Sequence, residues 1–298
     1  MAVQHRIDSA EGSRSSDRGG RRAESLECVS VVLPTYNERG NIVALIEEIH
    51  QVLDGVPTEI VVVDDDSPDG TADIVRERFA GREDVRVLVR TSDPSLAKSI
   101  RHGLEAATGD VLVVMDTDFN HPPEHLAFMV ESLRWYDCVS GSRYLFGGGM
   151  ESRKRLTFSW LFNVFVRTAT GGQITDNLYG YFAIRADVLR ALKYDEIFWG
   201  YGDYCIRLLY FLQRKKAAVL QFPVMNGSRR SGTANSAFVS TLFQYVAATL
   251  PLAMKARLSR WTDRSSLDET DEIAVGADDA VGKPKHGERA CTAKRQNA

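Results

Sequence analysis

Short apolar runs alternate with stretches of helical periodicity through the first half of this sequence, and this alternation constrains the fold more than any other feature. The runs are rich in β-branched residues and almost continuously apolar, as in EIVVVDD at 59–65. Between them, apolar residues recur at three- and four-residue intervals, which is typical of amphipathic helices. Strands are predicted at 28–33, 59–65, 85–89, 110–116 and 137–141, and helices at 42–53, 71–79, 95–107 and 123–135.

This order predicts an α/β domain around a mainly parallel sheet, because strands and helices alternate along the chain. Strands that are apolar on both sides are expected where helices cover both faces of a sheet. Ligands of such sheets bind beyond the carboxyl ends of the strands. The notable polar segments lie at those ends: Tyr36 to Glu38, Asp64 to Asp66, and Asp116 with Asp118. We therefore expect a ligand site at this edge.

The two ends of the chain differ in composition from its middle. The first 27 residues are rich in Ser, Gly and charge, and residues 262–298 carry an acidic block followed by a basic one. Such blocks are typical of solvated tails. We predict tails at 1–27 and 262–298, a folded α/β domain at 28–232, and an amphipathic helical segment at 233–261.

Composition excludes several classes of protein. The formal net charge of −3 does not fit a uniformly basic nucleic-acid binder, so no nucleic-acid partner is expected. The N-terminal segment lacks the apolar core of a signal peptide, and a cytoplasmic location is expected. No cysteines form a CxxC pair, which predicts reduced core thiols at Cys28, Cys138, Cys205 and Cys291.

The segment MDTDFN at 115–120 places Asp116 and Asp118 directly after a buried strand. On a turn at that point, both carboxylates can face one site. Carboxylate oxygens suit Mg²⁺ or Mn²⁺, which commonly bind one or two carboxylates together with phosphate oxygens. The pair by itself is weak evidence, because most such pairs are solvated loop acids or helix caps. No histidines have metal-ligand spacing, so core or surface roles are predicted for His102, His121 and His125.

The segment DDDSPDG at 64–70 ends a second strand with three acids. Its second half is predicted to form a turn, with Asp69 or Thr71 capping the next helix. That role does not account for Asp64 and Asp65. Both can accept hydrogen bonds from a base or a ribose, and we interpret at least one of them as a ligand.

The segment LPTYNER at 33–39 follows the first strand with an aromatic and an acidic residue. Tyr36 would hold a planar base, and Glu38 would accept a hydrogen bond from it. A helix-entry loop without a ligand explains the same residues and is the alternative.

Taken in chain order, PTYNERGN, VVVDDDSPDGT, VMDTDFNHPPE and GSRY (141–144) resemble glycosyltransferase family 2. The resemblance covers Val29 to Leu252 and is closest to dolichyl- or polyprenyl-phosphate mannose synthases. It implies a GT-A fold, which is a nucleotide-sugar-binding α/β sandwich. It also implies inverting, metal-dependent transfer of a hexose, with GDP-mannose as donor, a polyprenyl or dolichyl phosphate as acceptor, and Mg²⁺ or Mn²⁺ as cofactor.

The resemblance also implies roles for the residues at matching positions. The nucleotide is placed against Pro34, Tyr36, Glu38, Val63, Asp65, Asp116 and Thr117. The catalytic set is Asp116, Asp118, Arg143 and Arg229. The metal ligands are Asp118 and Asn120, and the acceptor phosphate is assigned to Arg143, Arg155 and Ser159.

The chain departs from the family pattern mainly on the sugar and acceptor side. Tyr179 stands where a D-x-x-S-G-F pattern has serine, and Asn235 stands where R-x-x-G-x-S-K has lysine. The segment TSDPSLAKS at 91–99 lacks the usual glycines. Asn120 replaces a frequent glutamine and keeps an amide oxygen. These departures leave the donor sugar and the acceptor open.

Two uncharged segments next to basic residues raise the question of membrane contact. Residues 233–254 carry no charge and are followed by Lys255 and Arg257, but polar residues interrupt them, so they make a poor membrane span. Residues 156–166 follow three basic residues at 153–155. Both segments are typical of interfacial helices, and buried core helices are the alternative. The first interpretation predicts peripheral contact with the cytoplasmic face of a membrane.

Three functions remain open. The first is a polyprenyl-phosphate sugar synthase, whose phosphate acceptor has a second pKa of about 6 and needs no base. The second is transfer to a hydroxyl of a soluble or peptide-bound acceptor, which needs a carboxylate such as Asp203 as base. The third is a nucleotide-sugar-binding protein without turnover. The presence of both Asp116 and Asp118 argues against this third function.

Overall fold

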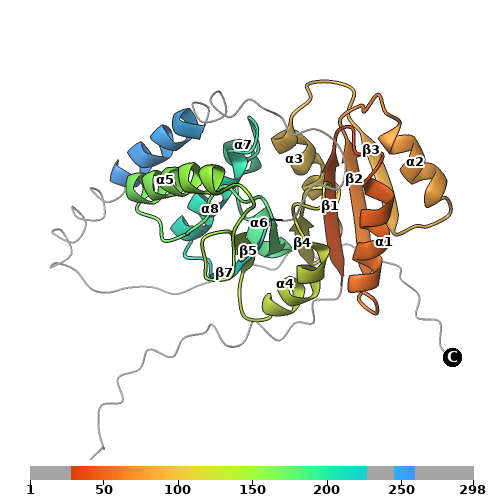
Figure 1. The fold of residues 1–298 in the computed structure, drawn as a ribbon, viewed down its shortest axis with the longest axis horizontal. Helices are drawn as coiled ribbons and strands as arrows, with labels where there is room; N and C mark the ends of the chain where they lie inside the picture. Colours follow the sequence, from red (N-terminus) through yellow and green to blue (C-terminus); the bar gives the residue numbers. More distant parts are fainter. Residues whose placement is uncertain (1–27, 227–244, 259–298) are drawn as a thin grey trace, which may run out of the picture.

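The computed structural model describes residues 28–226 and 245–258. Within them lies a seven-stranded sheet with the order β3-β2-β1-β4-β6-β5-β7 (Figure 1). Its strands are β1 (Val29–Thr35), β2 (Thr58–Asp64), β3 (Val85–Val89), β4 (Val111–Val114), β5 (Cys138–Ser142), β6 (Phe182–Arg185) and β7 (Val219–Pro223).

Six of these seven described strands point the same way. β1 pairs in parallel with β2 and with β4, and β2 pairs in parallel with β3. β6 is antiparallel to both β4 and β5, so β5 and its parallel neighbour β7 return to the direction of β4. The predicted mainly parallel sheet is confirmed. One edge therefore collects the carboxyl ends of six strands and the start of β6.

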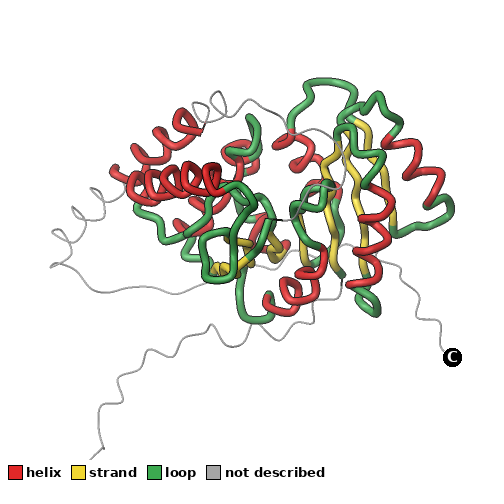
Figure 2. The backbone as a smooth tube through the Cα atoms, in the orientation of Figure 1, coloured by secondary structure: helices red, strands yellow, loops and turns green. Residues whose placement is uncertain are grey.

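Helices cover both faces of the sheet (Figure 2). They are α1 (Ile42–Val52), α2 (Thr71–Arg78), α3 (Leu96–Ala106), the 3₁₀ turn η1 (Pro123–His125), α4 (Leu126–Ser132), α5 (Arg153–Thr170), α6 (Ala186–Arg190), α7 (Tyr194–Ile197) and α8 (Tyr204–Arg214). Val31 and Leu33 of β1 pack with α1, α2 and α4, whereas Val32 packs with α3, α6 and α8. Because successive strand residues point to opposite faces, one apolar strand contributes side chains to the hydrophobic cores on both faces of the sheet.

A third apolar cluster joins α5 and α8 to residues 245–258, which form a helix beside α5 (Figure 1). The cluster contains Phe162 of α5, Tyr210 of α8 and Leu252. The described part of the predicted amphipathic segment is therefore helical and packs on one side. The rest of that segment and both predicted tails lie outside the described residues. Nowhere in 28–226 or 245–258 is there a helix with the length and apolar character needed to cross a membrane.

The predicted boundaries of β1 to β5 agree with the structure to within two residues. β6 and β7 are additional strands that the sequence patterns did not predict. The predicted helix 123–135 is a 3₁₀ turn followed by α4, which ends at Ser132.

The N-terminal residues of α1 and α2 make contacts that differ from ordinary side-chain capping. Asn41 is the N-cap of α1, but its side chain donates to Glu38 Oε2 (2.6 Å) and does not cap the helix. The N-cap of α2 is Gly70, with φ of +77°, where Asp69 or Thr71 was predicted. Asp69 still accepts from the Thr71 N–H (2.9 Å), so it supports the first turn.

Candidate functional site

The carboxyl ends of β1, β2 and β4 bring the predicted polar segments to one edge. The Asp65 N–H donates to the Thr35 carbonyl (3.0 Å) across the end of β1 and β2. On the other side of β1, the Met115 N–H donates to the Val32 carbonyl (3.4 Å), so Asp116 begins beside the same strand end. The chain order changes direction between β1 and β4, and ligands of open α/β sheets bind at such a switch point.

The residues assigned to the nucleotide meet at the ends of β1 and β2. Pro34 and Val63 are partners in the β1–β2 register, and their side chains are buried. Glu38 is half-buried and accepts from Asn41 Nδ2 (2.6 Å). Tyr36 is 58% exposed, so its ring is open to stacking on a base. Of these four residues, Tyr36 is therefore the one displayed to solvent.

Asp64 holds the turn that follows β2. Its Oδ1 accepts from the hydroxyls of Thr35 (2.9 Å) and Ser67 (2.6 Å), and its Oδ2 accepts from the Ser67 N–H (2.9 Å). The side chain is buried. These contacts give Asp64 a structural role, so the ligand interpretation of this acidic segment depends on Asp65.

Asp65 is held by three groups that the sequence patterns did not single out. Its Oδ1 accepts from the Arg90 guanidinium (2.5 Å) and from the Ser99 hydroxyl (2.6 Å). Its Oδ2 accepts from the Ser95 N–H (2.9 Å). A nucleotide that contacts this carboxylate would share it with Arg90. The sequence signal for that partner was slight: a cation directly after the strand predicted at 85–89.

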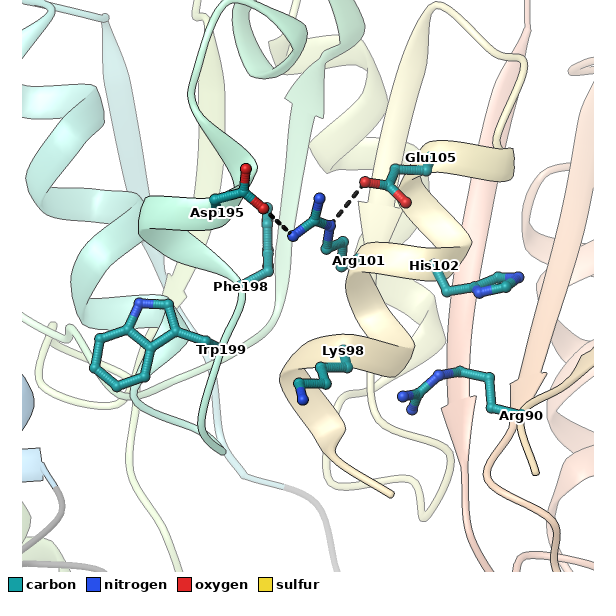
Figure 3. Close-up of a pocket in the computed structure, with 8 residues that line it drawn as sticks. All are labelled: Arg90, Lys98, Arg101, His102, Glu105, Asp195, Phe198 and Trp199. Carbon is teal, nitrogen blue, oxygen red and sulfur yellow. Dashed lines mark hydrogen bonds and ion pairs between the residues drawn. The ribbon is translucent and has the colours of Figure 1, made fainter. Parts of the chain in front are cut away.

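A cavity of about 350 Å³ lies beyond Arg90, between α3 and α7 (Figure 3). It is lined by Arg90, Lys98, Arg101, His102, Glu105, Asp195, Phe198 and Trp199. Its cations already have partners, since Arg101 pairs with Glu105 (2.7 Å) and Asp195 (2.5 Å), and Lys98 pairs with Asp93. Arg90 links it to Asp65, but none of the predicted site residues lines it. We therefore treat the cavity as separate from the site.

The Asp-x-Asp segment forms a tight turn after β4. Asp118 is buried and accepts from Asn120 through the backbone N–H (3.0 Å) and Nδ2 (2.7 Å). Thr117 is also buried, whereas Asp116 keeps 45% of its side chain exposed. Phe119 has φ of +66°, a left-handed backbone that a non-glycine residue adopts at a cost of about 1–3 kcal/mol. The two aspartates therefore lie in one strained turn, and the side chain of Asp116 is much more exposed than that of Asp118.

Asp118 and Asn120 offer a carboxylate and an amide oxygen, which are ligand types that Mg²⁺ and Mn²⁺ prefer. In the structure Asn120 faces Asp118 with its Nδ2, and its Oδ1 accepts from Asn226 Nδ2 (3.1 Å), so an ion would take both oxygens only after the amide turns over. Among the residues that the structure describes, no group of three or more His, Cys, Asp or Glu side chains could hold a metal. Two protein ligands completed by phosphate oxygens agree with both observations.

Arg143 follows β5 and forms a buried ion pair with Asp176. Its Nε and Nη2 donate to the two carboxylate oxygens (2.7 and 2.9 Å), and its backbone N–H donates to the same group (3.1 Å). Burial lowers the pKa of Arg143, but the charge and hydrogen bonds of Asp176, with smaller contributions from Tyr144 and Tyr179, together raise this pKa by more, so the guanidinium stays charged. Asp176 engages two of the five guanidinium N–H groups, which holds the side chain while donors for a phosphate remain.

One side of α5 leads from solvent to this ion pair. Arg155, Ser159 and Asn163 are four residues apart and therefore share a helix face. Asn163 Nδ2 donates to the Ser159 carbonyl (3.0 Å) and to Asp176 Oδ1 (3.4 Å). Arg155 is exposed at the start of the helix. The residues predicted to bind the acceptor, Arg143 included, thus lie along one connected path.

Three further residues that the sequence singled out are Arg229, Asn235 and Asp203. Arg229 lies outside the described residues, as does Asn235. Asp203 is buried, forms an ion pair with Arg207 and accepts from the Tyr201 N–H (2.7 Å). A general base must reach the proton that it removes. The geometry therefore gives no support to Asp203 as the base of a hydroxyl-acceptor reaction.

The strand order and the helices on both faces define the class of fold, which is the GT-A fold. The chain is similar in structure to glucosyl-3-phosphoglycerate synthase from Mycobacterium tuberculosis, solved with Mn²⁺, UDP and glucosyl-3-phosphoglycerate. The TM-score is 0.60 and the identity 22%, over 76% of this chain and 80% of that one. A structure of the same synthase with Mg²⁺ and UDP gives a TM-score of 0.58 at 23% identity, over 76% of this chain and 79% of that one.

Sequence comparison gives the family. The model of glycosyl transferase family 2 matches residues 30–193, more than half of the chain, and the chain belongs to this family. It is 34% identical over 223 residues to a dolichol-phosphate mannosyltransferase of Pyrococcus furiosus, covering 73% of this chain and only 61% of that protein. It is 37% identical over 212 residues to an undecaprenyl-phosphate mannosyltransferase of Micrococcus luteus, covering 68% of this chain and 85% of that protein.

Proposed function

We propose that this chain is a metal-dependent, inverting glycosyltransferase that transfers mannose from GDP-mannose to a polyprenyl phosphate. The observation that carries the proposal is the contact between two half-sites. We call the residues at the ends of β1, β2 and β4 the nucleotide half-site, and those at β5 and α5 the acceptor half-site. The Tyr179 hydroxyl donates to the Asn120 carbonyl (2.8 Å), and the Tyr179 ring centre lies 5.1 Å from the Arg143 guanidinium carbon. The metal-binding turn and the acceptor arginine are therefore one side chain apart. The names of the two relatives support the choice of acceptor and sugar.

Each half-site has its own task in this proposal. Tyr36 stacks on the base, and the exposed carboxylate of Asp116 faces the sugar diphosphate. A divalent ion, when held by Asp118 and Asn120, supplies positive charge against the negative charge that grows on the leaving nucleotide. Arg143 holds the acceptor phosphate by charge-assisted hydrogen bonds, with Arg155 and Ser159 on the approach to it.

The reaction then needs no proton transfer. A phosphate oxygen attacks the anomeric carbon opposite the diphosphate, and the new C–O bond forms as the bond to the nucleotide diphosphate breaks. The diphosphate leaves with the electron pair. Because the phosphate attacks from the opposite face, the configuration at the anomeric carbon inverts. A monoester phosphate has a second pKa of about 6 and is already largely dianionic at neutral pH. The burial of Asp203, the carboxylate considered as a base, agrees with this chemistry.

A lipid acceptor also fits the apolar surfaces of two helices. Large exposed apolar side chains are Phe158, Trp160, Leu161 and Phe165 on α5, and Leu250, Met254 and Leu258 on the helix at 245–258. Three basic residues at 153–155 begin α5. Apolar helix faces with basic neighbours are typical of peripheral membrane contact. We include contact with the cytoplasmic face of a membrane in the proposal.

The test is transfer from labelled nucleotide sugars. The full chain is incubated with undecaprenyl phosphate, Mg²⁺ or Mn²⁺, and radiolabelled GDP-mannose, with labelled UDP-glucose as a second donor. We expect label in the organic phase, in a product that mild acid cleaves, and more of it from GDP-mannose. Label that stays in the aqueous phase with every donor would contradict the proposal. Label on an added soluble hydroxyl acceptor would favour the second function.

A further inference from the structure

The turn at 116–122 is flanked by an aromatic cluster of His121, Tyr179 and Tyr181, all of them buried. The His121 ring stacks on Tyr181 with ring centres 4.9 Å apart and planes 8° apart. It meets Tyr179 edge-on, with ring centres 4.6 Å apart. His121 Nδ1 also accepts from the Asp116 N–H (2.8 Å), which ties the cluster to the start of the turn.

The two tyrosines bond to the backbone of the same turn. The Tyr179 hydroxyl donates to the Asn120 carbonyl (2.8 Å), and the Tyr181 hydroxyl donates to the Pro122 carbonyl (2.8 Å). Phe119, between the metal ligands, has φ of +66° and depends on such outside support to stay there.

The reversed direction of β6 places the tyrosines at this edge. β6 is antiparallel to β4 and β5, so it begins where they end, and Tyr179 and Tyr181 immediately precede it. The Tyr179 ring also contacts the acceptor side. The Arg143 guanidinium carbon lies 5.1 Å from the ring centre, and a Cβ on Gly141 would come within 2.8 Å of the ring. Tyr179 therefore contacts both half-sites.

We propose that Tyr179 is a positioning residue that sets the metal-binding turn relative to Arg143, an inference that rests on the proposed function. Its hydroxyl donates a hydrogen bond to the turn, and its ring lies against the Arg143 guanidinium. A serine side chain at this position would be too short to make both contacts, so both require the tyrosine.

Two variants separate the hydroxyl from the ring. Tyr179→Phe loses one hydrogen bond to the turn, so Mn²⁺ affinity in the presence of GDP should fall about three- to tenfold in an EPR titration. Tyr179→Ser loses the ring as well and should also raise KM for polyprenyl phosphate. The matched control is Tyr204→Phe, which removes a buried hydroxyl that donates to the Gly180 carbonyl (3.5 Å). We expect wild-type values for it.

Wild-type Mn²⁺ affinity in Tyr179→Phe overturns the inference. An equal loss of affinity in Tyr204→Phe also overturns it, because the effect would then follow from the loss of any buried hydroxyl. The Mn²⁺ titration needs no turnover. A wild-type chain that binds Mn²⁺ with GDP but transfers no sugar would therefore refute the proposed function, while a weaker Tyr179→Phe titration would still support the positioning role.

Discussion

Asp116 and Asp118 are separated by one residue and have different surroundings. Asp118 is buried against Asn120, which bonds both of its oxygens, whereas nearly half of the Asp116 side chain is exposed. The left-handed Phe119 turns the chain between Asp118 and Asn120 and brings their side chains together. At the residue scale, this difference supports the proposed division, in which Asp118 holds the ion and Asp116 faces the sugar diphosphate.

Asp118→Ala should therefore abolish transfer, with kcat falling at least about a thousandfold, because the charge stabilisation from the ion is worth several kcal/mol. EDTA should have the same effect on the wild type, and added Mg²⁺ or Mn²⁺ should reverse it. Asp73→Ala, which changes an exposed aspartate of α2, is the control and should keep wild-type kinetics. Undiminished turnover in excess chelator would falsify the metal role.

At the scale of elements, β1 to β5 were predictable because each contains a short run rich in apolar or β-branched residues that is bounded by turn residues. β6 and β7 were not, since FAIR has only four residues and VLQFP ends in a proline. A run of that length gives a weak periodic signal. The reversal of β6 follows from its pairing with β4 and β5, which are distant in sequence and leave no local pattern.

The same limit applies to the site. The acids at strand ends were predictable because parallel strands end at one edge. The partners of those acids were not. Arg90 is 25 residues from Asp65, and Tyr179 is 59 residues from Asn120. Spacing along the chain carries no information about which distant side chains meet, so these contacts required the structure.

The α5 face gives a prediction at this scale. Arg155→Ala removes a charge-assisted contact worth roughly 1.5–3 kcal/mol, so acceptor affinity should fall about ten- to a hundredfold. GDP affinity should not change, because the nucleotide residues lie at β1 and β2. Arg155→Lys should recover only part of the loss, since an ammonium group lacks the guanidinium fork. The measurements are kinetics with polyprenyl phosphate varied and calorimetry of GDP binding.

Lys154→Ala is the matched control, because Lys154 is an exposed neighbouring base that does not share the face of Ser159 and Asn163. It should leave the acceptor KM unchanged. A parallel change of acceptor KM and GDP affinity in Arg155→Ala would mean that Arg155 is structural.

At the scale of the whole molecule, the nucleotide half-site at β1, β2 and β4 and the acceptor half-site at β5 and α5 lie on either side of β6. The acceptor half-site is also the one next to exposed apolar helix residues, among them Trp160. A lipid phosphate could therefore reach Arg143 while its chain stays at a membrane surface. In the proposed function, this arrangement links contact with the membrane to the transfer reaction.

Trp160→Ala should weaken binding to vesicles that contain anionic lipid by about three- to tenfold, since a large apolar side chain is lost from the interface. Trp135→Ala is the matched control, because Trp135 is similarly exposed but follows α4. Co-sedimentation with vesicles measures the binding, and GDP affinity checks that the fold is intact. Equal binding by wild type and Trp160→Ala would contradict membrane contact through α5.

The central claim is that a phosphate oxygen displaces the nucleotide with inversion at the sugar. Phosphorus-coupled proton NMR of the product from GDP-α-mannose and polyprenyl phosphate tests it directly. We expect a β-linked mannose whose anomeric proton is coupled to one phosphorus, and no coupling to a second phosphate. An α-linked product, or an anomeric proton without phosphorus coupling, would contradict it.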